Sequence, residues 1–94
     1  MYKTPKLETI EILGVTVRIE IDHYRLENEE QCDGMYNNKI IYLKKHYSDK
    51  DHYKRIFLHE CMHALCDIQG YQLDDHLEES IVNTMSYLSV ELLK

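Results

Sequence analysis

Basic residues are scarce in this sequence, and no strongly basic cluster occurs. Eleven lysines and arginines stand against 17 aspartates and glutamates, which gives a formal net charge of −6. Neighbouring basic residues are limited to the pairs Lys44-Lys45 and Lys54-Arg55. Nucleic-acid binding depends largely on neutralising phosphates, and an anionic membrane attracts basic rather than acidic proteins. We therefore expect neither nucleic acid nor membrane as a partner.

Cysteine is also sparse, and long apolar runs are absent. The three cysteines, Cys32, Cys61 and Cys66, are odd in number, and no two have CxxC spacing. The first residues contain no apolar signal core, and no run of 18 apolar residues occurs anywhere. These absences predict a cytoplasmic protein with reduced thiols. Cys61 and Cys66 are expected to be small buried hydrophobic residues.

The residues that are present form a composition typical of a small folded domain. The chain has 94 residues, 44% of them hydrophobic, and eight tyrosines. This is too apolar for a disordered segment, although a chain of this size has a modest core. No repeat, linker or low-complexity tract divides it. We expect one domain covering residues 1–94, to which a bound metal ion would add stability.

Alternating apolar residues in the first half predict a small sheet. Apolar side chains occur at every second position in residues 10–12 and 15–21, with a break at Leu13-Gly14. A second hairpin is predicted in residues 34–43, turning at Asn37-Asn38. Residues 39–43 are a candidate edge strand that could pair with an extended peptide. About three antiparallel strands are expected.

Two helices are predicted in the second half. The first opens with the capping-box residues Ser48 and Asp51 and ends at Gly70, a residue favoured just after helices. The second runs from about residue 75 to residue 93. Apolar residues at three-to-four spacing predict its buried stripe, made of Leu77, Ile81, Met85, Leu88 and Leu92. Strands precede helices, so the predicted fold class is α+β, with a small antiparallel sheet packed on two helices.

The segment Leu58–Ala64, LHECMHA, carries the clearest chemical signal. On a helix, His59 and His63 lie one above the other on a single face, where two imidazoles can meet one Zn²⁺ ion. Glu60 points about 100° round the helix from His59, so it can reach a metal-bound water without binding the ion. The ion lowers the pKa of that water, and Glu60 takes its proton and delivers it to a leaving amine. A chance match and a non-catalytic structural zinc site are the alternatives.

A third metal ligand must come from elsewhere in the chain. The elongated HExxH motif would need glycine at position 66 and histidine at position 69, where this chain has Cys66 and Gln69. The candidates lie on the last predicted helix: His76, Glu78 and Glu79. The predicted apolar stripe mildly favours Glu78, which lies near its edge. Asn83, one turn after Glu79, favours Glu79, because such a residue can orient a ligating carboxylate or a neighbouring histidine.

The segments RIFLHECMHALCDIQGY and LEESIVNTM, preceded by ILGVTVRIEI and CDGMYNNKIIYL, resemble a known family. They are similar to the small HExxH zinc metallopeptidase-like proteins of phages and prophages. Those are relatives of the ImmA/IrrE metallopeptidase family within the gluzincin group. The resemblance covers nearly the whole chain and is strongest at residues 59–63. It implies a minimal zincin-like domain in which Zn²⁺ is bound by His59, His63 and Glu79, with Glu60 as the catalytic residue.

The resulting expectation is a zinc-dependent metallopeptidase, phage- or prophage-encoded, that acts on a protein or peptide substrate. The chain lacks the second lobe that closes the cleft in larger gluzincins. The alternative is a catalytically silent, zinc-stabilised interaction or regulatory protein. A DNA-associated, SprT-like protease with a third histidine ligand is disfavoured by the acidic charge. The histidines His23, His46 and His52 are expected to be ordinary surface residues.

Overall fold

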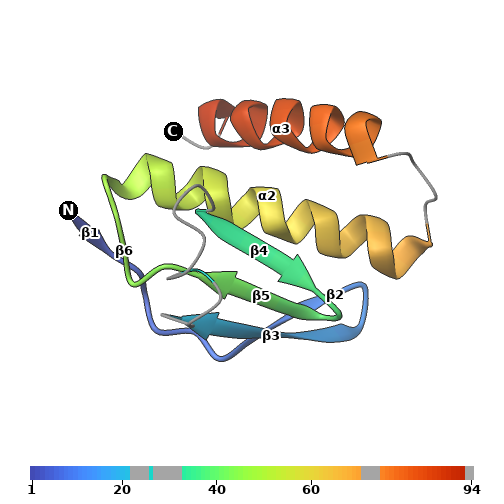
Figure 1. Cartoon of the computed structure of the whole chain (residues 1–94), viewed down its shortest axis with the longest axis horizontal. Coiled ribbons are helices and arrows are strands. Elements are labelled where there is room, and N and C mark those ends of the chain that lie inside the picture. Colours follow the sequence, from blue (N-terminus) through green and yellow to red (C-terminus); the bar gives the residue numbers. More distant parts are fainter. Residues whose placement is uncertain (22–25, 27–32, 71–74, 93–94) are drawn as a thin grey trace.

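A computed structural model describes residues 1–21, 26, 33–70 and 75–92. The elements of the chain are β1 (Tyr2–Lys3), β2 (Thr9–Ile12), β3 (Val15–Ile21), β4 (Gly34–Asn37), β5 (Ile40–Leu43), β6 (His46–Tyr47), α2 (Lys50–Gln69) and α3 (Asp75–Leu92). In these described ranges, strands β1–β6 precede helices α2 and α3, which confirms the α+β class. They stack in three layers, with α2 between the sheet and α3 (Figure 1). None of the helices in the described part of the chain is long and apolar enough to cross a membrane.

The main sheet has four strands in the order β2-β3-β5-β4, and β1 pairs separately with β6. The pairs β2–β3 and β4–β5 are antiparallel, whereas β3 and β5 are parallel. The prediction of about three antiparallel strands was therefore wrong in number, and wrong in direction for the β3–β5 pair. Residues 39–43 were also wrongly placed at an edge, because β5 is a central strand and β4 is the edge. The consecutive burial of Ile41, Tyr42 and Leu43 fits a central strand that is covered on both faces.

Each hairpin is closed by two residues with positive φ. These are Leu13 (50°) and Gly14 (78°) between β2 and β3, and Asn38 (48°) and Lys39 (63°) between β4 and β5. Such turns match the right-handed twist of the flanking strands. The predicted turn at Asn37-Asn38 was one residue early, since Asn37 still belongs to β4 and lies opposite Ile40. The shift matters because one residue of slip would move every side chain to the other face.

The core lies between the sheet and α2. Val17, Ile41 and Ala64 are fully buried, and Leu43 is 1% exposed. The small side chain of Ala64 allows α2 to lie close to the strands. Because α2 has α3 on its other side, side chains of this helix that face away from the sheet are partly buried against α3.

Both ends of α2 are defined by local contacts. The Asp49 side chain accepts a hydrogen bond from the His52 backbone N–H at 2.7 Å, so Asp49 is the N-cap. The predicted cap, Ser48, was wrong by one residue, and its hydroxyl instead lies 2.9 Å from Nδ1 of His52. Gly70 ends the helix as predicted, with a φ of 72° and its N–H donating to the Asp67 carbonyl at 3.1 Å.

The predicted orientation of α3 was wrong, because its apolar stripe faces solvent. Leu77, Ile81, Met85 and Leu88 are between 44% and 51% exposed, and the side chain of Leu92 lies outside the described residues. Val82 and Ser86, on the opposite side of the helix, are 1% and 2% exposed. Small side chains on that side allow α3 to lie close to α2. The same side carries Glu79 and Asn83.

Candidate metal centre

Two histidines of α2 form one half of the site. His59 and His63 lie one turn apart on the side of α2 that faces α3, and their side chains are only 18% and 14% exposed. Their Nε2 atoms are 3.2 Å apart, and the ring centroids are 4.8 Å apart. Helical i,i+4 spacing brings the rings together without help from the rest of the fold, as the sequence predicted.

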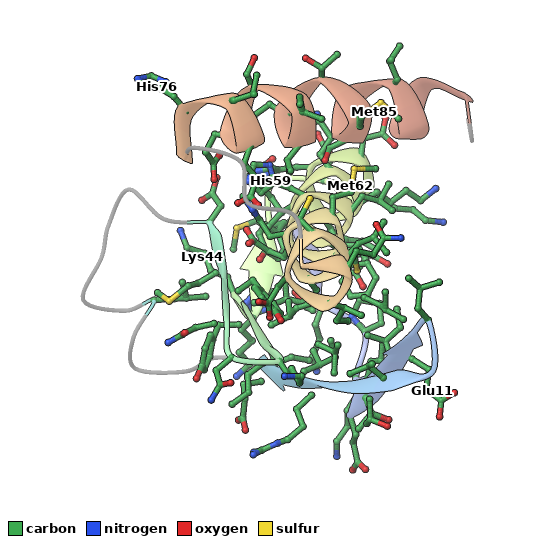
Figure 2. All side chains as sticks on the ribbon, turned by 90° about the vertical axis from the view of Figure 1, so that its right-hand side faces the viewer. Glu11, Lys44, His59, Met62, His76 and Met85 are labelled. Carbon is green, nitrogen blue, oxygen red and sulfur yellow. The ribbon has the colours of Figure 1, made fainter. Side chains whose placement is uncertain are left out.

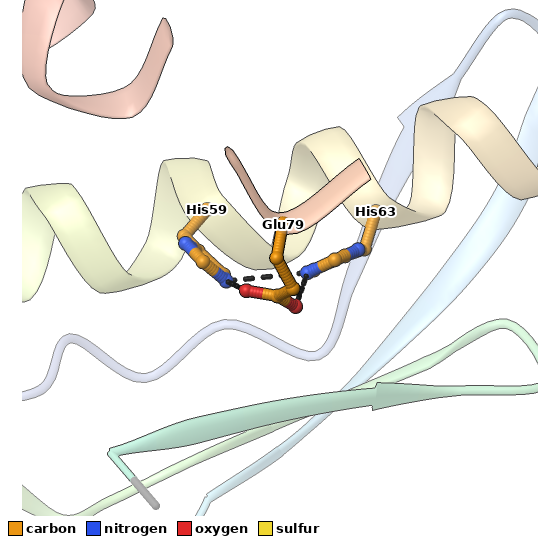
Figure 3. A group of neighbouring side chains, drawn as sticks. All are labelled: His59, His63 and Glu79. Atoms are coloured by element: carbon orange, nitrogen blue, oxygen red, sulfur yellow. Dashed lines mark hydrogen bonds and ion pairs between the residues drawn. The ribbon is translucent and has the colours of Figure 1, made fainter. Parts of the chain in front are cut away.

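Glu79 of α3 provides the other half (Figure 3). Its Oε1 atom lies 2.7 Å from Nε2 of His63, and its Oε2 atom lies 3.4 Å from Nε2 of His59. One ligand atom from each of the three residues lies within 4.8 Å of the others. The structure therefore brings together the three residues that the sequence analysis assigned to a metal, and this cluster could hold an ion.

The separations fit a single small ion. Ligand atoms about 2.0–2.1 Å from a tetrahedral zinc ion are roughly 3.3 Å from one another. The distances among the two Nε2 atoms and the Glu79 carboxylate range from 2.7 to 3.4 Å. Burial lowers the pKa of His59, against opposing effects of Glu79 and Asn83. The neutral imidazole that a metal requires is therefore favoured there.

The other two candidates for the third ligand do not reach the point where the Nε2 atoms of His59 and His63 meet Glu79. Glu78 approaches the second ring nitrogen of His63, with Oε2 3.0 Å from Nδ1. When Nδ1–H donates to Glu78, Nε2 keeps its lone pair toward Glu79. His76 is exposed and projects outward from the start of α3, away from His59 (Figure 2).

Each histidine thus has its own orienting residue on α3. Asn83 hydrogen-bonds the His59 side chain, one turn beyond Glu79, while Glu78 contacts His63 from the position before it. From the sequence, Asn83 was a candidate for this role, whereas Glu78 was predicted only as a competing ligand. The adjacency of Glu78 and Glu79 was the available signal, because neighbouring helical residues point about 100° apart and can approach one ring from two sides.

Glu60 lies in the same pocket but outside the ligand cluster. Glu60 is only 6% exposed, and this burial raises the pKa of its carboxyl to about 7. Of the two neighbouring charged groups, His63 lowers this pKa and Glu79 raises it. It lines the pocket together with His59, His63 and Glu79. Glu60 is thus placed beside the three potential ligands without being one of them.

Gly34 is a site residue that the sequence analysis missed. It begins β4, where the strand passes close to α2. A Cβ atom at Gly34 would lie 2.7 Å from Cγ2 of Ile56 and 3.2 Å from Oε2 of Glu60. Glycine is needed here for close approach and not for an unusual φ. Its absent side chain allows the edge strand to border the pocket beside Glu60.

The pocket lies between β4, α2 and α3, and acidic side chains predominate over basic ones in its lining. Five carboxylates and one lysine are among its lining residues: Asp33, Glu60, Asp67, Glu78, Glu79 and Lys39. The Tyr36 hydroxyl on β4 donates to Asp67 at 2.6 Å. Burial, followed by this contact, raises the pKa of Tyr36 to about 12, so the phenol stays neutral.

A second polar cluster holds the start of β4 against α2. Asp33 lies 3.0 Å from Nζ of Lys44 and 3.2 Å from Nε2 of His52, and the Tyr47 hydroxyl donates to its carbonyl at 2.6 Å. Burial acts to raise the pKa of Asp33, but Lys44 and His52 outweigh it and lower the pKa overall. The prediction that His52 is an ordinary surface residue was therefore wrong.

Of the remaining singled-out residues, Cys66 reaches the site, because its side chain hydrogen-bonds Glu78. His46 is exposed as predicted. Cys61 and Cys66 are free thiols, only half-buried, and Cys61 packs against the core. His23 and Cys32 lie outside the described residues.

Comparison with known proteins gives no family for this chain. No protein-family model matches it, and neither does any curated protein or solved structure. Its chemistry is therefore inferred from the residues of the site: two imidazoles and a carboxylate that converge on one point, with a buried glutamate beside them.

Proposed function

We propose that this chain is a zinc-dependent metallopeptidase with a minimal zincin-like fold, in which His59, His63 and Glu79 hold the ion. The observation that carries the proposal is the convergence of these three residues from two helices. Two histidines and one glutamate are a ligand set of catalytic zinc sites that keep the fourth position open. The resemblance of the sequence to phage and prophage metallopeptidase-like proteins supports the same function and a phage or prophage origin.

Glu60 is the proposed catalytic residue. A zinc ion bound here would supply Lewis acidity and lower the pKa of a coordinated water. Glu60 follows His59 on α2 and lines the pocket outside the ligand cluster, so its carboxylate accepts a proton and later donates it to the leaving amine. Glu78 and Asn83 hold the two imidazole rings in orientation.

The proposed substrate is an extended segment of a protein or peptide. β4 is an edge of the main sheet and borders the pocket along its whole length, so a substrate strand can add to it. Acidic lining residues outnumber basic ones and favour cationic substrates. Asp67 lies one turn after His63, and its carboxylate is hydrogen-bonded by the neutral Tyr36 hydroxyl. We infer a preference for lysine or arginine near the scissile bond.

The alternative function is a catalytically silent, zinc-stabilised interaction or regulatory protein. One observation favours it: a row of large apolar side chains on α3 faces solvent. In such a protein the ion would join α3 to α2, and the surface rather than the pocket would carry the function. Glu60 would then have no chemical role.

Zinc content and hydrolysis, measured together, distinguish the two functions. The purified chain is expected to hold about one zinc ion and to melt at a lower temperature after chelation, because the ion binds only the folded state. Wild type should cut members of an unbiased peptide library, and Glu60→Gln should keep zinc but cut none. Zinc without any hydrolysis, together with capture of a stable partner, would support the alternative. Failure to take up zinc during zinc-replete refolding would exclude both.

A further inference from the structure

The start of the edge strand β4 is attached to three other parts of the fold through one residue. The carboxylate of Asp33 lies 3.0 Å from Nζ of Lys44, which follows β5, and 3.2 Å from Nε2 of His52, in the first turn of α2. The carbonyl oxygen of Asp33 accepts a hydrogen bond at 2.6 Å from the Tyr47 hydroxyl in β6. The side chain and the main-chain carbonyl of Asp33 therefore both hold the strand in place.

The imidazole of His52 is itself held in one orientation. Its Nδ1 atom lies 2.9 Å from the Ser48 hydroxyl, and its ring packs edge-on against Tyr47, with the ring centroids 5.3 Å apart. When the Ser48 hydroxyl donates to Nδ1, the neutral ring carries its proton on Nε2 and donates to Asp33, and a protonated ring donates there as well. Together with Lys44, these four residues form the β4 anchor.

The sequence of contacts from serine to histidine to aspartate is also that of a hydrolase triad, but the surroundings do not fit one. A nucleophilic serine needs a pocket for its substrate and donors for an oxyanion. Within the described part of the chain, Asp33 lines the pocket beside the candidate metal centre, whereas Ser48 and His52 do not. The carboxylate of Asp33 is also shared with Lys44. The contacts are therefore better explained by their effect on β4.

The anchor acts just before the closest approach of β4 to the site. Gly34 follows it directly, and a Cβ atom at Gly34 would lie 2.7 Å from Cγ2 of Ile56 and 3.2 Å from Oε2 of Glu60. From there β4 runs toward the C-terminal end of α2, where the Tyr36 hydroxyl donates to Asp67 at 2.6 Å (Figure 1). Because Gly34 has no side chain to act as a spacer, the distance between the strand and Glu60 depends on what holds the strand.

The anchor is firmer than the contact at the other end of β4. The hydrogen bond between Tyr36 and Asp67 lies at the surface. In the anchor, Tyr47 is 3% exposed and the side chain of His52 is 22% exposed. A hydrogen bond is stronger where water is excluded. The start of β4 is therefore the fixed end of the strand that borders the pocket.

We propose that His52 and Asp33 are positioning residues for substrate binding. They fix β4 so that a substrate strand added to this edge lies at the correct distance from Glu60. The inference rests on the proposed function, in which β4 binds the substrate. Main-chain hydrogen bonds to an edge strand supply affinity, so a displaced β4 weakens substrate binding more than it slows the chemical step. Neither residue is a proposed metal ligand, so zinc affinity should not depend on them.

Steady-state hydrolysis by His52→Ala tests this role, because His52 does not line the pocket and acts on a substrate through Asp33. We expect KM to rise about 5- to 10-fold with kcat changed less than about 3-fold, since binding is weakened while Glu60 keeps its place on α2. His52→Gln should restore most of the wild-type KM, because its amide N–H can replace Nε2–H as the donor. The matched control is His46→Ala, at an exposed histidine of β6, which should leave KM unchanged.

Amide hydrogen exchange of the zinc-free chain provides a readout that needs no hydrolysis. His52→Ala and Asp33→Ala should each speed exchange at residues 34–37 by about 3- to 10-fold, because the strand opens more often. The double variant should exchange no faster than Asp33→Ala alone, since both substitutions remove the same contact. Exchange in β3 should stay as in wild type, which separates a local effect on β4 from a general loss of stability.

The possible results lead to different conclusions. A wild-type KM in His52→Ala, or a fall in kcat with KM unchanged, overturns the proposed role in substrate binding. Equally faster exchange in β3 and β4 also overturns it, because His52 would then stabilise the fold as a whole. If wild type binds zinc but cuts no peptide, the proposed function fails, and exchange at residues 34–37 decides alone: faster exchange in His52→Ala retains the positioning of β4, and unchanged exchange refutes it.

Discussion

α2 and α3 are neighbouring helices that use their apolar residues in opposite ways. α2 lies between the sheet and α3, so Ala64 contacts the strands while His59 and His63 turn toward the other helix. α3 packs on α2 through a face of small and polar side chains that includes Val82 and Ser86. Its large apolar residues lie on the outside. A helix enclosed on two sides can bury polar groups on one side and apolar groups on the other, whereas a helix at the periphery buries only one face.

The exposure of the apolar side chains of α3 forgoes a substantial part of the free energy of burial. Full burial of a leucine, isoleucine or methionine side chain contributes about 1.5–3 kcal/mol, so leaving four of them half-exposed forgoes on the order of 3–6 kcal/mol. That is comparable with the whole stability of many small domains. A metal ion joining α2 to α3 would offset this loss.

The largest expected effect is on the rate of hydrolysis, and it distinguishes the proposed catalytic residue Glu60 from the metal ligands on the same helix. Glu60→Gln should lower kcat by about 10²–10⁴-fold with zinc still bound, because the proton acceptor is lost and no ligand is removed. His63→Ala should lose both zinc and hydrolysis. Peptide hydrolysis and zinc content are measured on each variant. Wild-type turnover by Glu60→Gln would show that α2 supplies ligands only.

The next effect compares three neighbouring residues on the inner face of α3. Glu79→Ala should weaken zinc binding most, because it removes a proposed ligand. Glu78→Ala and Asn83→Ala should each weaken it about 10- to 100-fold, since each leaves one histidine ring without its orienting contact. Chelator competition gives the three affinities. If Glu78→Ala proves the most damaging, the two glutamates exchange roles and the register of α3 over α2 is wrong.

Two adjacent residues of α3 test which face packs. Val82 is 1% exposed and Ile81 is 44% exposed. Val82→Ala should lower the free energy of unfolding by about 1–3 kcal/mol, whereas Ile81→Ala should lower it by less than about 0.5–1 kcal/mol. Urea denaturation of the two variants and wild type, at the same protein concentration, provides the comparison. The reverse order would restore the buried stripe that the sequence predicted.

The smallest expected effect is on the preference for positively charged substrates, and it concerns Asp67 near the C-terminal end of α2. Asp67→Asn should reduce a preference for lysine-containing over glutamine-containing peptides by about 3- to 10-fold, because an exposed carboxylate attracts a cation only modestly. Binding to zinc-loaded Glu60→Gln, followed by fluorescence anisotropy, measures this without turnover. Glu11→Gln, the same change on the distant side of the sheet, is the control (Figure 2). An unchanged preference in Asp67→Asn would assign the acidic pocket no role in selection.

Features governed by near neighbours in the chain could be predicted from the sequence. The alternation of Val17 and Ile19 with polar residues predicted β3, and Gly70 predicted the end of α2. The pairing of His59 with His63 followed from helix geometry alone, because residues four apart share a face whatever lies around them. The cap at Asp49 and the turn at Asn38-Lys39 were each displaced by one residue, since adjacent polar residues offer almost equivalent local contacts.

Contacts between distant segments could not be predicted in the same way. The parallel pairing of β3 with β5, the close approach at Gly34 and the contact of His52 with Asp33 all join residues far apart in sequence. Glu78 could be recognised as an orienting residue only once its carboxylate was placed beside Nδ1 of His63. None of these leaves a periodic signal in the sequence.

By itself, the sequence determined which residues share a helix or strand face, because backbone geometry fixes side-chain direction over a few residues. It therefore set the His59–His63 pair and the separation of Glu79 from the apolar stripe on α3. Only the tertiary structure decided which face of α3 turns inward. Periodicity favoured the apolar face, but the close packing of small side chains and the approach of Glu79 to the two histidines selected the opposite one. A hydrophobic pattern shows which residues share one side of a helix, but the elements packed against the helix determine which side is buried.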